Sequence, residues 1–295
     1  MRSRRSDPIT LRAVRGGGFS GRSGKPAPRG RWPVSRKRDV TLRTVLITGG
    51  ALRVGRELSL QLAADGWHVL VHCRRSRAEA DAVVRLIEQG GGVADVLCAD
   101  LERLDEVERL AVDAGEAATR RGSRLTALIN NASLFDYDTL DRMTADSWGR
   151  HIDVNLRAPI FLTRCFAAAV ADGDDGCVIN ILDNRIAAPN PDYFSYGVAK
   201  LGLSAATGTL ALALAPRLRV CGIAPGITLV SGGQTAEEFR MAHRANPMRR
   251  GCTVDQIAMA VRFILGAPSL TGQTIVIDGG QSLANPGRDV AFLAA

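Results

Sequence analysis

Three polar residues in the second half of the chain could transfer protons if the fold brings them together. Tyr196 and Lys200 are four positions apart, so both side chains would lie on one face of a helix. An ammonium group beside a phenol lowers the phenol's pKa, ordinarily about 10, and makes the tyrosine usable near neutrality. Asp183 follows the apolar run 178–182 and could approach from a buried strand. The pattern predicts acid–base chemistry, although this spacing also occurs on solvated helix faces.

A nucleotide-binding turn is predicted far upstream of these residues. The β-branched run 44–47 indicates a short strand, and the glycine-rich stretch 48–55 would form a turn that opens a helix to about residue 65. Glycine lets the backbone approach a pyrophosphate, and a helix N-terminus offers free N–H groups. We therefore expect Gly49, Arg53 and Val54 to contact a dinucleotide. The alternative is a turn that only connects strand to helix.

The end of the second predicted strand, 68–72, indicates which dinucleotide would bind. NAD-binding proteins place an acidic residue here for the ribose hydroxyls, whereas this chain continues from His72 through Cys73 and Arg74 to Arg75 and Ser76. Guanidinium and hydroxyl groups suit a 2′-phosphate. The segment predicts NADPH/NADP+, with a solvated basic turn as the alternative.

Strands and helices alternate along the rest of the chain. Further helices are expected at about 77–88, 104–119, 145–171, 193–215 and 253–265, and further strands at 94–98, 125–130, 178–182, 219–223 and 274–277. This order predicts an α/β fold, a single doubly wound Rossmann domain with a mostly parallel seven-stranded sheet and helices on both faces. The polar stretch from about 224 to 250 is typical of a mobile lid.

Several residues are expected near the carboxyl ends of the strands, where such sheets bind ligands. Asn131, Ala132 and Ser133 follow a strand, and Phe135 in the next loop offers a surface for stacking, or packs under the loop. Asn155 lies inside a predicted helix, where asparagine is mildly unfavourable. That position suggests another role, such as binding a water molecule or the lysine.

The positive net charge of +8 is concentrated at the start of the 295-residue chain. Residues 1–40 hold twelve of the 38 basic residues but two of the 30 acidic ones, so residues 41–295 are nearly neutral. We expect no nucleic-acid partner for residues 41–295. The segment 1–40 is rich in Arg, Gly, Ser and Pro and is predicted to be disordered. Its origin is left open between a solvated tail or start-codon artefact, an Arg-rich targeting peptide, whose amphipathic helix the glycines and prolines oppose, and an RNA-binding arm.

Cysteine and histidine usage predicts no metal site. The six cysteines show no CxxC or zinc spacing, and the four histidines form no ligand cluster. Such cysteines are typical of a reducing compartment, so a cytoplasmic location is expected. No apolar run reaches the roughly 20 residues of a membrane span, so we expect a soluble protein without a membrane partner.

Residues 41–284 resemble the short-chain dehydrogenase/reductase superfamily. The signals that carry the resemblance are the turn 48–55, Asn131-Ala132-Ser133, Asn155, Tyr196 to Lys200, and Pro225-Gly226, in the superfamily's order. The resemblance implies that Asp100, Leu101, Pro225 and Gly226 also contact the cofactor. It also implies a homotetramer that assembles through the helices at about 145–171 and 193–215.

Within the superfamily the chain resembles the pteridine reductases, including the bacterial dihydromonapterin/dihydrofolate reductase branch. Most superfamily members have glycine at the position of Arg53 and serine at that of Asp183. The segments 72–76 and 131–135 are similar to the 2′-phosphate and pterin-holding segments. By this resemblance Phe135 stacks a pterin on the nicotinamide, Arg53 and Ser133 contact it, Asp183 and Tyr196 deliver protons, and Lys200 binds ribose and tunes Tyr196.

The chemistry of Asp183 is consistent with that resemblance. A carboxyl group can relay a proton through Tyr196 to a ring nitrogen as hydride reaches the adjacent carbon, whereas serine suits a carbonyl oxygen. An ionised Asp183 opposes ionisation of Tyr196, so Lys200 and the cofactor's positive ring must offset it. We expect NADPH-dependent reduction of a pterin, dihydropterin or dihydrofolate C=N bond. The alternatives are a carbonyl reductase, such as a 3-oxoacyl thioester reductase, and a non-catalytic NADP sensor, against which the Tyr–Lys pair argues.

Overall fold

The computed structural model describes residues 42–171, 173–230, 234–285, 287–289 and 292. All of them belong to one compact unit, Thr41–Ala295. The segment 1–40, expected to be disordered, lies outside the described residues, as do residues 231–233 of the expected lid.

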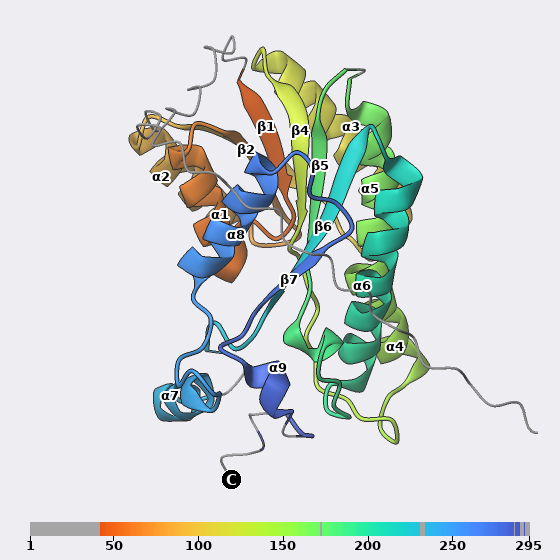
Figure 1. Ribbon diagram of the computed structural model, residues 1–295. Coiled ribbons are helices and arrows are strands. Elements are labelled where there is room, and N and C mark those ends of the chain that lie inside the picture. Colours follow the sequence, from red (N-terminus) through yellow and green to blue (C-terminus); the bar gives the residue numbers. More distant parts are fainter. Residues whose placement is uncertain (1–41, 172, 231–233, 286, 290–291, 293–295) are drawn as a thin grey trace, which may run out of the picture. The chain divides into compact units, whose positions relative to one another are not determined.

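Seven strands of the described chain form one sheet, in the order β3-β2-β1-β4-β5-β6-β7 (Figure 1). Their bounds are β1 Arg43–Ile47, β2 His68–Cys73, β3 Val93–Cys98, β4 Arg124–Asn130, β5 Gly176–Ile181, β6 Leu218–Pro225 and β7 Thr274–Ile277. Every neighbouring pair is parallel. The strand order reverses between β1 and β4, which confirms the predicted doubly wound sheet.

Helices cover both faces of this sheet. Their bounds are α1 Arg53–Ala64, α2 Arg77–Gln89, α3 Leu104–Arg120, α4 Ala145–Ile152, α5 Ala158–Ala169, α6 Phe194–Leu214, α7 Ala236–Arg244, α8 Val254–Gly266 and α9 Gln281–Ala284. Helices α1, α2 and α8 lie on one face, and α3, α5 and α6 lie on the other (Figure 1). This three-layer arrangement is that of a Rossmann fold.

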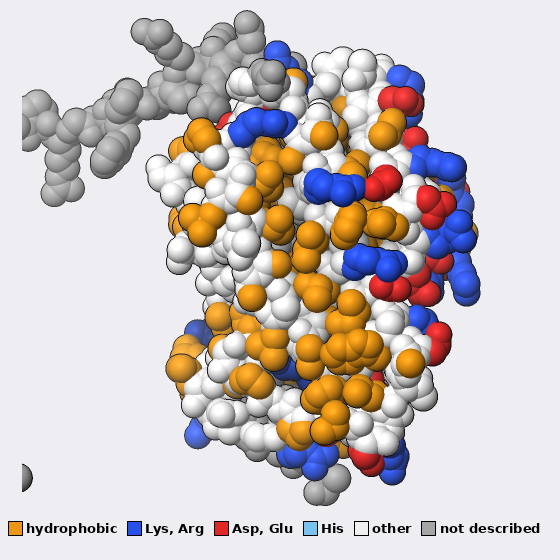
Figure 2. Space-filling model, turned by 90° about the vertical axis from the view of Figure 1, so that its right-hand side faces the viewer, with side chains coloured by type: hydrophobic (Ala, Val, Ile, Leu, Met, Phe, Trp, Pro, Cys, Tyr) orange, Lys and Arg blue, Asp and Glu red, His pale blue; other side chains and the backbone are white. Residues whose placement is uncertain are grey.

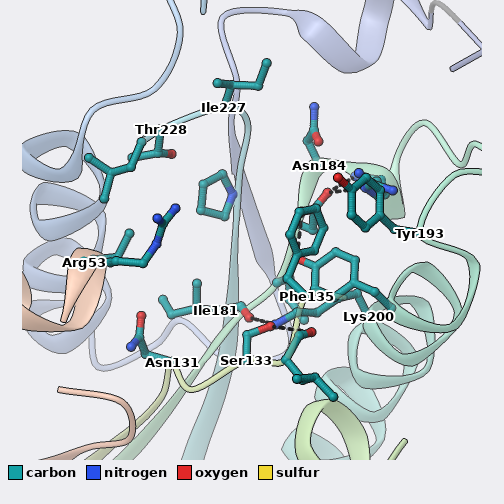
Figure 3. Close-up of a pocket in the computed structure, with 18 of the residues that line it drawn as sticks. Arg53, Asn131, Ser133, Phe135, Ile181, Asn184, Tyr193, Lys200, Ile227 and Thr228 are labelled. Atoms are coloured by element: carbon teal, nitrogen blue, oxygen red, sulfur yellow. Dashed lines mark hydrogen bonds and ion pairs between the residues drawn. The ribbon is translucent and has the colours of Figure 1, made fainter. Parts of the chain in front are cut away.

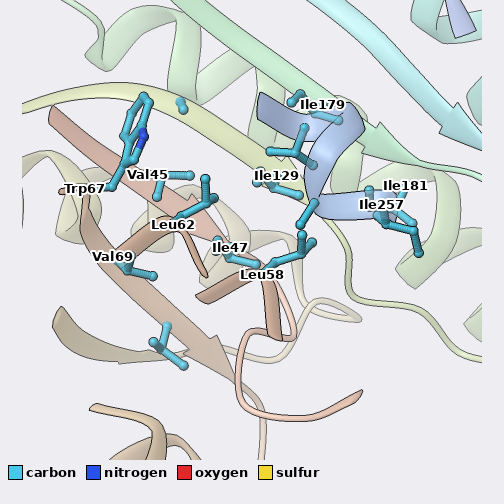
Figure 4. Packing of buried hydrophobic residues seen from close by; sticks show 14 of the residues in the cluster. Val45, Ile47, Leu58, Leu62, Trp67, Val69, Ile129, Ile179, Ile181 and Ile257 are labelled. Carbon is cyan, nitrogen blue, oxygen red and sulfur yellow. The ribbon is translucent and has the colours of Figure 1, made fainter. Parts of the chain in front are cut away.

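Two apolar layers hold the helices to the sheet. Successive side chains of a strand point to opposite faces, so Ile47 packs with Leu58 of α1 on one face while Leu46 packs with Phe166 of α5 on the other. Figure 4 shows the first layer, in which Ile129 and neighbouring residues meet α1 and α8. Because the central strands are buried on both faces, their sequences are largely apolar, and Asn130 and Asn180 are buried in them as a hydrogen-bonded pair.

The helix expected at about 145–171 is interrupted in the structure. A π-helical turn, Asp153–Arg157, separates α4 from α5. Pro159 stands at the start of α5 and has no N–H with which to bond the carbonyl four residues earlier, that of Asn155. Such π-turns occur often at functional sites. Asn155 therefore lies at a local change of helix geometry, which the sequence pattern did not indicate.

Helix α6 corrects the expectation about apolar length. Eighteen consecutive residues of this 21-residue helix have a mean hydropathy of 1.4, which by length and composition alone is enough to cross a membrane. The helix packs on the sheet through a buried face that includes Tyr196, Lys200 and Leu203. Its other face exposes Leu201 and Leu212, and apolar side chains gather on the side of the molecule where α5 and α6 lie (Figure 2). We therefore interpret α6 as a core helix with an uncovered apolar face.

The segment between β6 and α8, expected to be a lid, contains a helix. Helix α7 starts with a capping box in which Thr235 and Glu238 bond each other's backbone N–H. The segment expected to form a lid is therefore partly helical rather than an irregular loop.

Candidate active site

A cavity of about 890 Å³ opens at the carboxyl ends of the central strands. The turn after β1, the loop after β4, Asp183 after β5 and Pro225 at the end of β6 all line it. It therefore lies at the place where strand order reverses, which is where doubly wound sheets bind ligands. Its volume is at the upper end of the range for ligand sites.

Asp183, Tyr196 and Lys200 meet in this cavity, as the spacing predicted. Tyr196 and Lys200 are both buried on α6. The Tyr196 hydroxyl donates a hydrogen bond of 2.8 Å to Oδ2 of Asp183. The Lys200 ammonium donates to the Ile181 carbonyl at 2.8 Å, and its Nζ lies 5.6 Å from the centre of the Tyr196 ring. The structure thus places a phenol between a carboxylate and an ammonium group.

The pKa of Tyr196 does not shift in the direction expected from its lysine neighbour. Burial raises the pKa of Tyr196 well above its usual value, and the Asp183 charge adds to this effect. Burial also lowers the pKa of Lys200 to about 8, against the opposing charge of Asp183. Because the ammonium bonds a backbone carbonyl rather than the phenol oxygen, its influence on Tyr196 is weak. In this state Tyr196 is a neutral proton donor.

The turn that follows β1 can receive a phosphate group. Gly49 has a φ of +62°, and a Cβ atom on Gly55 would lie 2.0 Å from the Gly49 carbonyl oxygen, so both positions require glycine. Leu52 occupies the N-cap position of α1, and its side chain makes no capping hydrogen bond. The first N–H groups of α1 are therefore available to an anion at the helix N-terminus. Gly49, Arg53 and Val54 all line the cavity there.

Two side chains hold that turn from beneath. Asn131 donates its side-chain amide to the carbonyls of Thr48 at 2.9 Å and Gly49 at 3.2 Å. His72 accepts from the Gly49 N–H at 3.1 Å, and its Nε2 lies 3.1 Å from the Ala99 carbonyl. Burial lowers the pKa of His72 to about 4, so its ring is neutral. Both residues line the cavity, and their side chains bond the glycine turn. The sequence could not distinguish this supporting role from direct contact with a cofactor.

The predicted 2′-phosphate segment reaches the cavity through Arg74. Its guanidinium pairs with Glu102 at 2.7 Å and with Asp100 at 3.7 Å, and all three residues line the cavity together with Leu101. Arg75 and Ser76 do not line it, and Arg75 is exposed. Ser76 is the N-cap residue of α2, which begins at Arg77 directly after this segment.

Asn155 shapes the loop after β4. Its side-chain oxygen accepts from the Ser133 hydroxyl at 3.0 Å and the Leu134 N–H at 2.9 Å, and its amide donates to the Leu134 carbonyl at 2.9 Å. These three bonds use its polar atoms, and Asn155 itself is fully buried. Asn155 therefore holds Ser133 and Leu134 at the cavity. The sequence had suggested a role such as binding a water molecule or the lysine.

Phe135 belongs to an aromatic wall on the side of the cavity opposite Arg53 (Figure 3). Its ring stacks on Tyr193 with centroids 4.1 Å apart, and it meets the Tyr196 ring edge-on at 4.7 Å. Tyr193 has a φ of +52°, a costly conformation for an aromatic residue. The strained backbone turns its ring onto Phe135, next to the proton donor.

Arg53 connects the glycine turn to the segment after β6. It has a φ of +52°, a region that favours glycine, and its guanidinium donates to the Val230 carbonyl at 2.8 Å. The side chain stands across the cavity from Phe135 and Tyr193 (Figure 3). A planar ligand between these two walls would contact both.

Four charged residues at this end of the cavity were not predicted as site residues: Arg185, Asp192, Arg288 and Asp289. Arg185 lies in a 3₁₀ turn, Asn184–Ile186, directly after Asp183, and Asp192 lies in the loop that follows this turn. Arg288 and Asp289 come from beyond α9. Arg185, Arg288 and Asp289 line the cavity. Their positions follow no strand or helix period. The sequence could have revealed them as site residues only if it were known in advance that the two segments meet in the fold.

The comparisons with known proteins agree with this geometry. Residues 43–240 match the model of the short chain dehydrogenase family. The chain is 32% identical over 247 residues to a 3-oxoacyl-[acyl-carrier-protein] reductase of Synechocystis, covering 82% of this chain and 97% of that protein. The chain belongs to the short-chain dehydrogenase/reductase family, and it is an oxidoreductase of that family.

Two solved structures are similar over most of the chain. They are FolM alternative dihydrofolate reductase 1 from Brucella suis, with 40% identity and a TM-score of 0.78, and the same enzyme from Brucella canis, with 39% identity and a TM-score of 0.77. The first match covers 82% of this chain and 95% of the other, and the second covers 83% and 96%. Both of those structures are complexes with NADP.

Proposed function

We propose that the protein is a pteridine reductase, which reduces a C=N bond of a pterin, dihydropterin or dihydrofolate. It is an NADPH-dependent oxidoreductase, and NADPH supplies the hydride when bound. The observation that carries the substrate class is the hydrogen bond from the Tyr196 hydroxyl to the Asp183 carboxylate, 2.8 Å long, beside the stacked rings of Phe135 and Tyr193. The likeness to the two FolM dihydrofolate reductases supports the same substrate class.

The cavity has the groups that hold NADPH. The uncapped N-terminus of α1 and the glycines at 49 and 55 would receive the pyrophosphate. Arg74 would release its ion pair with Glu102 or Asp100 and pair with the 2′-phosphate instead. Arg75 and Ser76 follow Arg74 at the same strand end and would add a guanidinium and a hydroxyl group. Leu101, Ala132, Pro225 and Gly226 line the remaining length of the cavity, where adenine, ribose and nicotinamide would lie.

Each residue at the reacting end has a defined task in this proposal. Tyr196 donates its proton to the ring nitrogen next to the carbon that receives hydride, and Asp183 orients the phenol and returns a proton from solvent. Lys200 holds the ribose hydroxyls beside Tyr196. Phe135 stacks on the pterin, while Arg53 and Ser133 contact its polar edge from the other wall and the floor.

A carbonyl reductase is the second candidate. The similarity to a 3-oxoacyl-[acyl-carrier-protein] reductase favours it. A carbonyl oxygen needs a hydrogen-bond donor beside the tyrosine, whereas Asp183 accepts hydrogen bonds from Tyr196 and from the Arg185 N–H. A carboxylate at this position favours a substrate that presents a nitrogen to be protonated.

The substrate class is tested by NADPH oxidation on a substrate panel. Dihydrobiopterin, dihydromonapterin and dihydrofolate form one arm, and simple ketones and an acetoacetyl thioester form the other. The proposal predicts turnover in the pterin arm. Activity confined to the carbonyl arm would instead establish the second candidate.

We also propose a cytoplasmic homotetramer that takes small-molecule substrates. The uncovered apolar face of α6, with Leu212 84% exposed, supports self-association through the helices at 145–171 and 193–215. Sedimentation of the purified chain would test this assembly, and a monomer at micromolar concentration would contradict it.

A further inference from the structure

Arg185, Asp192, Arg288 and Asp289 form a closed network at the end of the cavity beyond Asp183. The Asp192 carboxylate accepts two hydrogen bonds from the Arg288 guanidinium and one from the Asp289 N–H, each 2.8 Å long. The Asp192 carbonyl accepts from Arg185 Nη1 at 2.6 Å. Arg185 Nη2 is ion-paired with the Asp289 carboxylate, which closes the network.

The network holds residues 288 and 289 against the segment that follows Asp183. The side chains of Arg185 and Asp192 are 7% and 3% exposed, and that of Asp289 is 16% exposed. Burial alone would raise the pKa of Asp192, but Arg288 and the Asp289 N–H hold it below the usual value. A buried charge of this kind is tolerated only when it is paired with an opposite charge. Removal of one partner leaves the remaining charge buried and uncompensated.

Within the network, the two arginines are paired with the two carboxylates of Asp192 and Asp289. Arg185 is directed to Asp289, to the Asp192 carbonyl and, at 3.5 Å, to Asp183, while Arg288 is directed to Asp192. Among the described residues, Arg53 is a cavity-lining arginine outside this network, and it stands on the opposite wall (Figure 3). Asp289 occupies the Arg185 guanidinium, and Asp192 occupies that of Arg288, whose side chain is 52% exposed. An anionic group beside Asp183 would therefore find both guanidinium groups already paired with carboxylates.

We propose that Asp289 makes the substrate site selective against an acidic side chain on the substrate. It does so by adding a negative charge to the cavity wall and by engaging Arg185, which would otherwise bind a carboxylate. The inference rests on the proposed pterin reduction and defines its substrate further. A dihydropterin with a short hydroxylated side chain is accepted, whereas dihydrofolate, whose tail ends in glutamate carboxylates, is disfavoured by like-charge repulsion.

The test is the Asp289→Asn variant, which removes the charge and keeps the shape of the side chain. Its kcat/KM for dihydrofolate, divided by that for dihydrobiopterin, should exceed the wild-type ratio by about tenfold. The gain should appear in the KM for dihydrofolate, and it should shrink at high ionic strength, because a released Arg185 acts through its charge. Asp289→Glu should restore the wild-type ratio.

Arg262→Ala is the matched control, since it removes an ion pair with Asp65 that joins α8 to α1 outside the cavity lining. Its substrate ratio should equal that of the wild type. An unchanged ratio in a folded Asp289→Asn protein would overturn the proposal, and so would an equal gain in Arg262→Ala.

A binding measurement separates this inference from the proposed function. Calorimetry of folic acid and of biopterin with the NADP+ complex requires no turnover, and Asp289→Asn should strengthen folic acid binding alone. If the wild type reduces no pterin, the proposed function fails, while this comparison still decides the role of Asp289. Equal folic acid affinity in both proteins would contradict it.

Discussion

At the scale of single residues, the site depends on the proton held between Tyr196 and Asp183. Burial and the Asp183 charge raise the pKa of Tyr196, so the phenol enters the reaction protonated. Reduction of a C=N bond consumes a proton at nitrogen, and a neutral phenol can supply it. The same environment would oppose the reverse, oxidative direction, which needs the phenolate as base.

The Tyr196→Phe variant should therefore lose turnover by about 10²- to 10⁴-fold, the usual contribution of a general acid. NADPH affinity should be retained, because the ring and its packing remain. Tyr137→Phe, at a tyrosine that does not line the cavity, should keep full activity. Turnover by Tyr196→Phe equal to that of wild type would remove Tyr196 from the proton path.

Spacing made part of the site predictable at this scale. Tyr196 and Lys200 share a helix, and Asp183 follows a strand, so the local pattern of the sequence was enough to place all three. The network of Arg185, Asp192, Arg288 and Asp289 joins positions about one hundred residues apart, in the short segment between Asp183 and α6 and in the residues beyond α9. No local period connects such segments, so only the folded chain brings them together.

At the scale of elements, the turn between β1 and α1 determines how closely a cofactor approaches. Gly55→Ala would place a Cβ 2.0 Å from the Gly49 carbonyl oxygen, a clash with backbone that costs about 1–3 kcal/mol in similar overpacked sites. We expect NADPH affinity, measured by fluorescence titration, to fall by at least about tenfold.

Gly115→Ala in the middle of α3 is the matched control for that variant. The nearest atom to its added Cβ lies 3.9 Å away, so alanine should stabilise the helix by about 0.5–1 kcal/mol and leave NADPH binding unchanged. Wild-type NADPH affinity in Gly55→Ala would contradict the proposed position of the pyrophosphate.

Element positions were predictable because strands and helices in this fold have clear periods. The central strands are buried on both faces and read as apolar runs, and glycine or polar residues separate them from the helices. The π-turn at Asp153–Arg157 and helix α7 were not predicted. The first depends on one missing N–H at Pro159, and the second on a capping box within a polar segment.

At the scale of the whole molecule, buried histidine makes the fold sensitive to acid. The pKa of His72 is about 4 in the folded chain and about 6.5 when unfolded. Between these values the unfolded chain binds the extra proton, so the free energy of unfolding falls as pH drops from 6.5 to 4, by on the order of 3 kcal/mol.

Urea unfolding at stepped pH values would measure this loss in wild type and in His72→Gln. His68, also buried with a lowered pKa, contributes in both proteins, so their difference isolates His72. The variant should lose less stability across this interval. Parallel pH curves for the two proteins would show that His72 is not buried in its neutral form.

The central claim is that Asp183 directs the chemistry to a C=N bond. The most direct measurement is kcat/KM for dihydrobiopterin and for an acetoacetyl thioester in wild type and in Asp183→Ser. We predict that the wild type prefers the dihydropterin and that Asp183→Ser loses about 10²-fold or more on it, without a matching loss on the thioester. A wild type that reduces only the thioester, or an Asp183→Ser variant that keeps full dihydropterin activity, would contradict the claim.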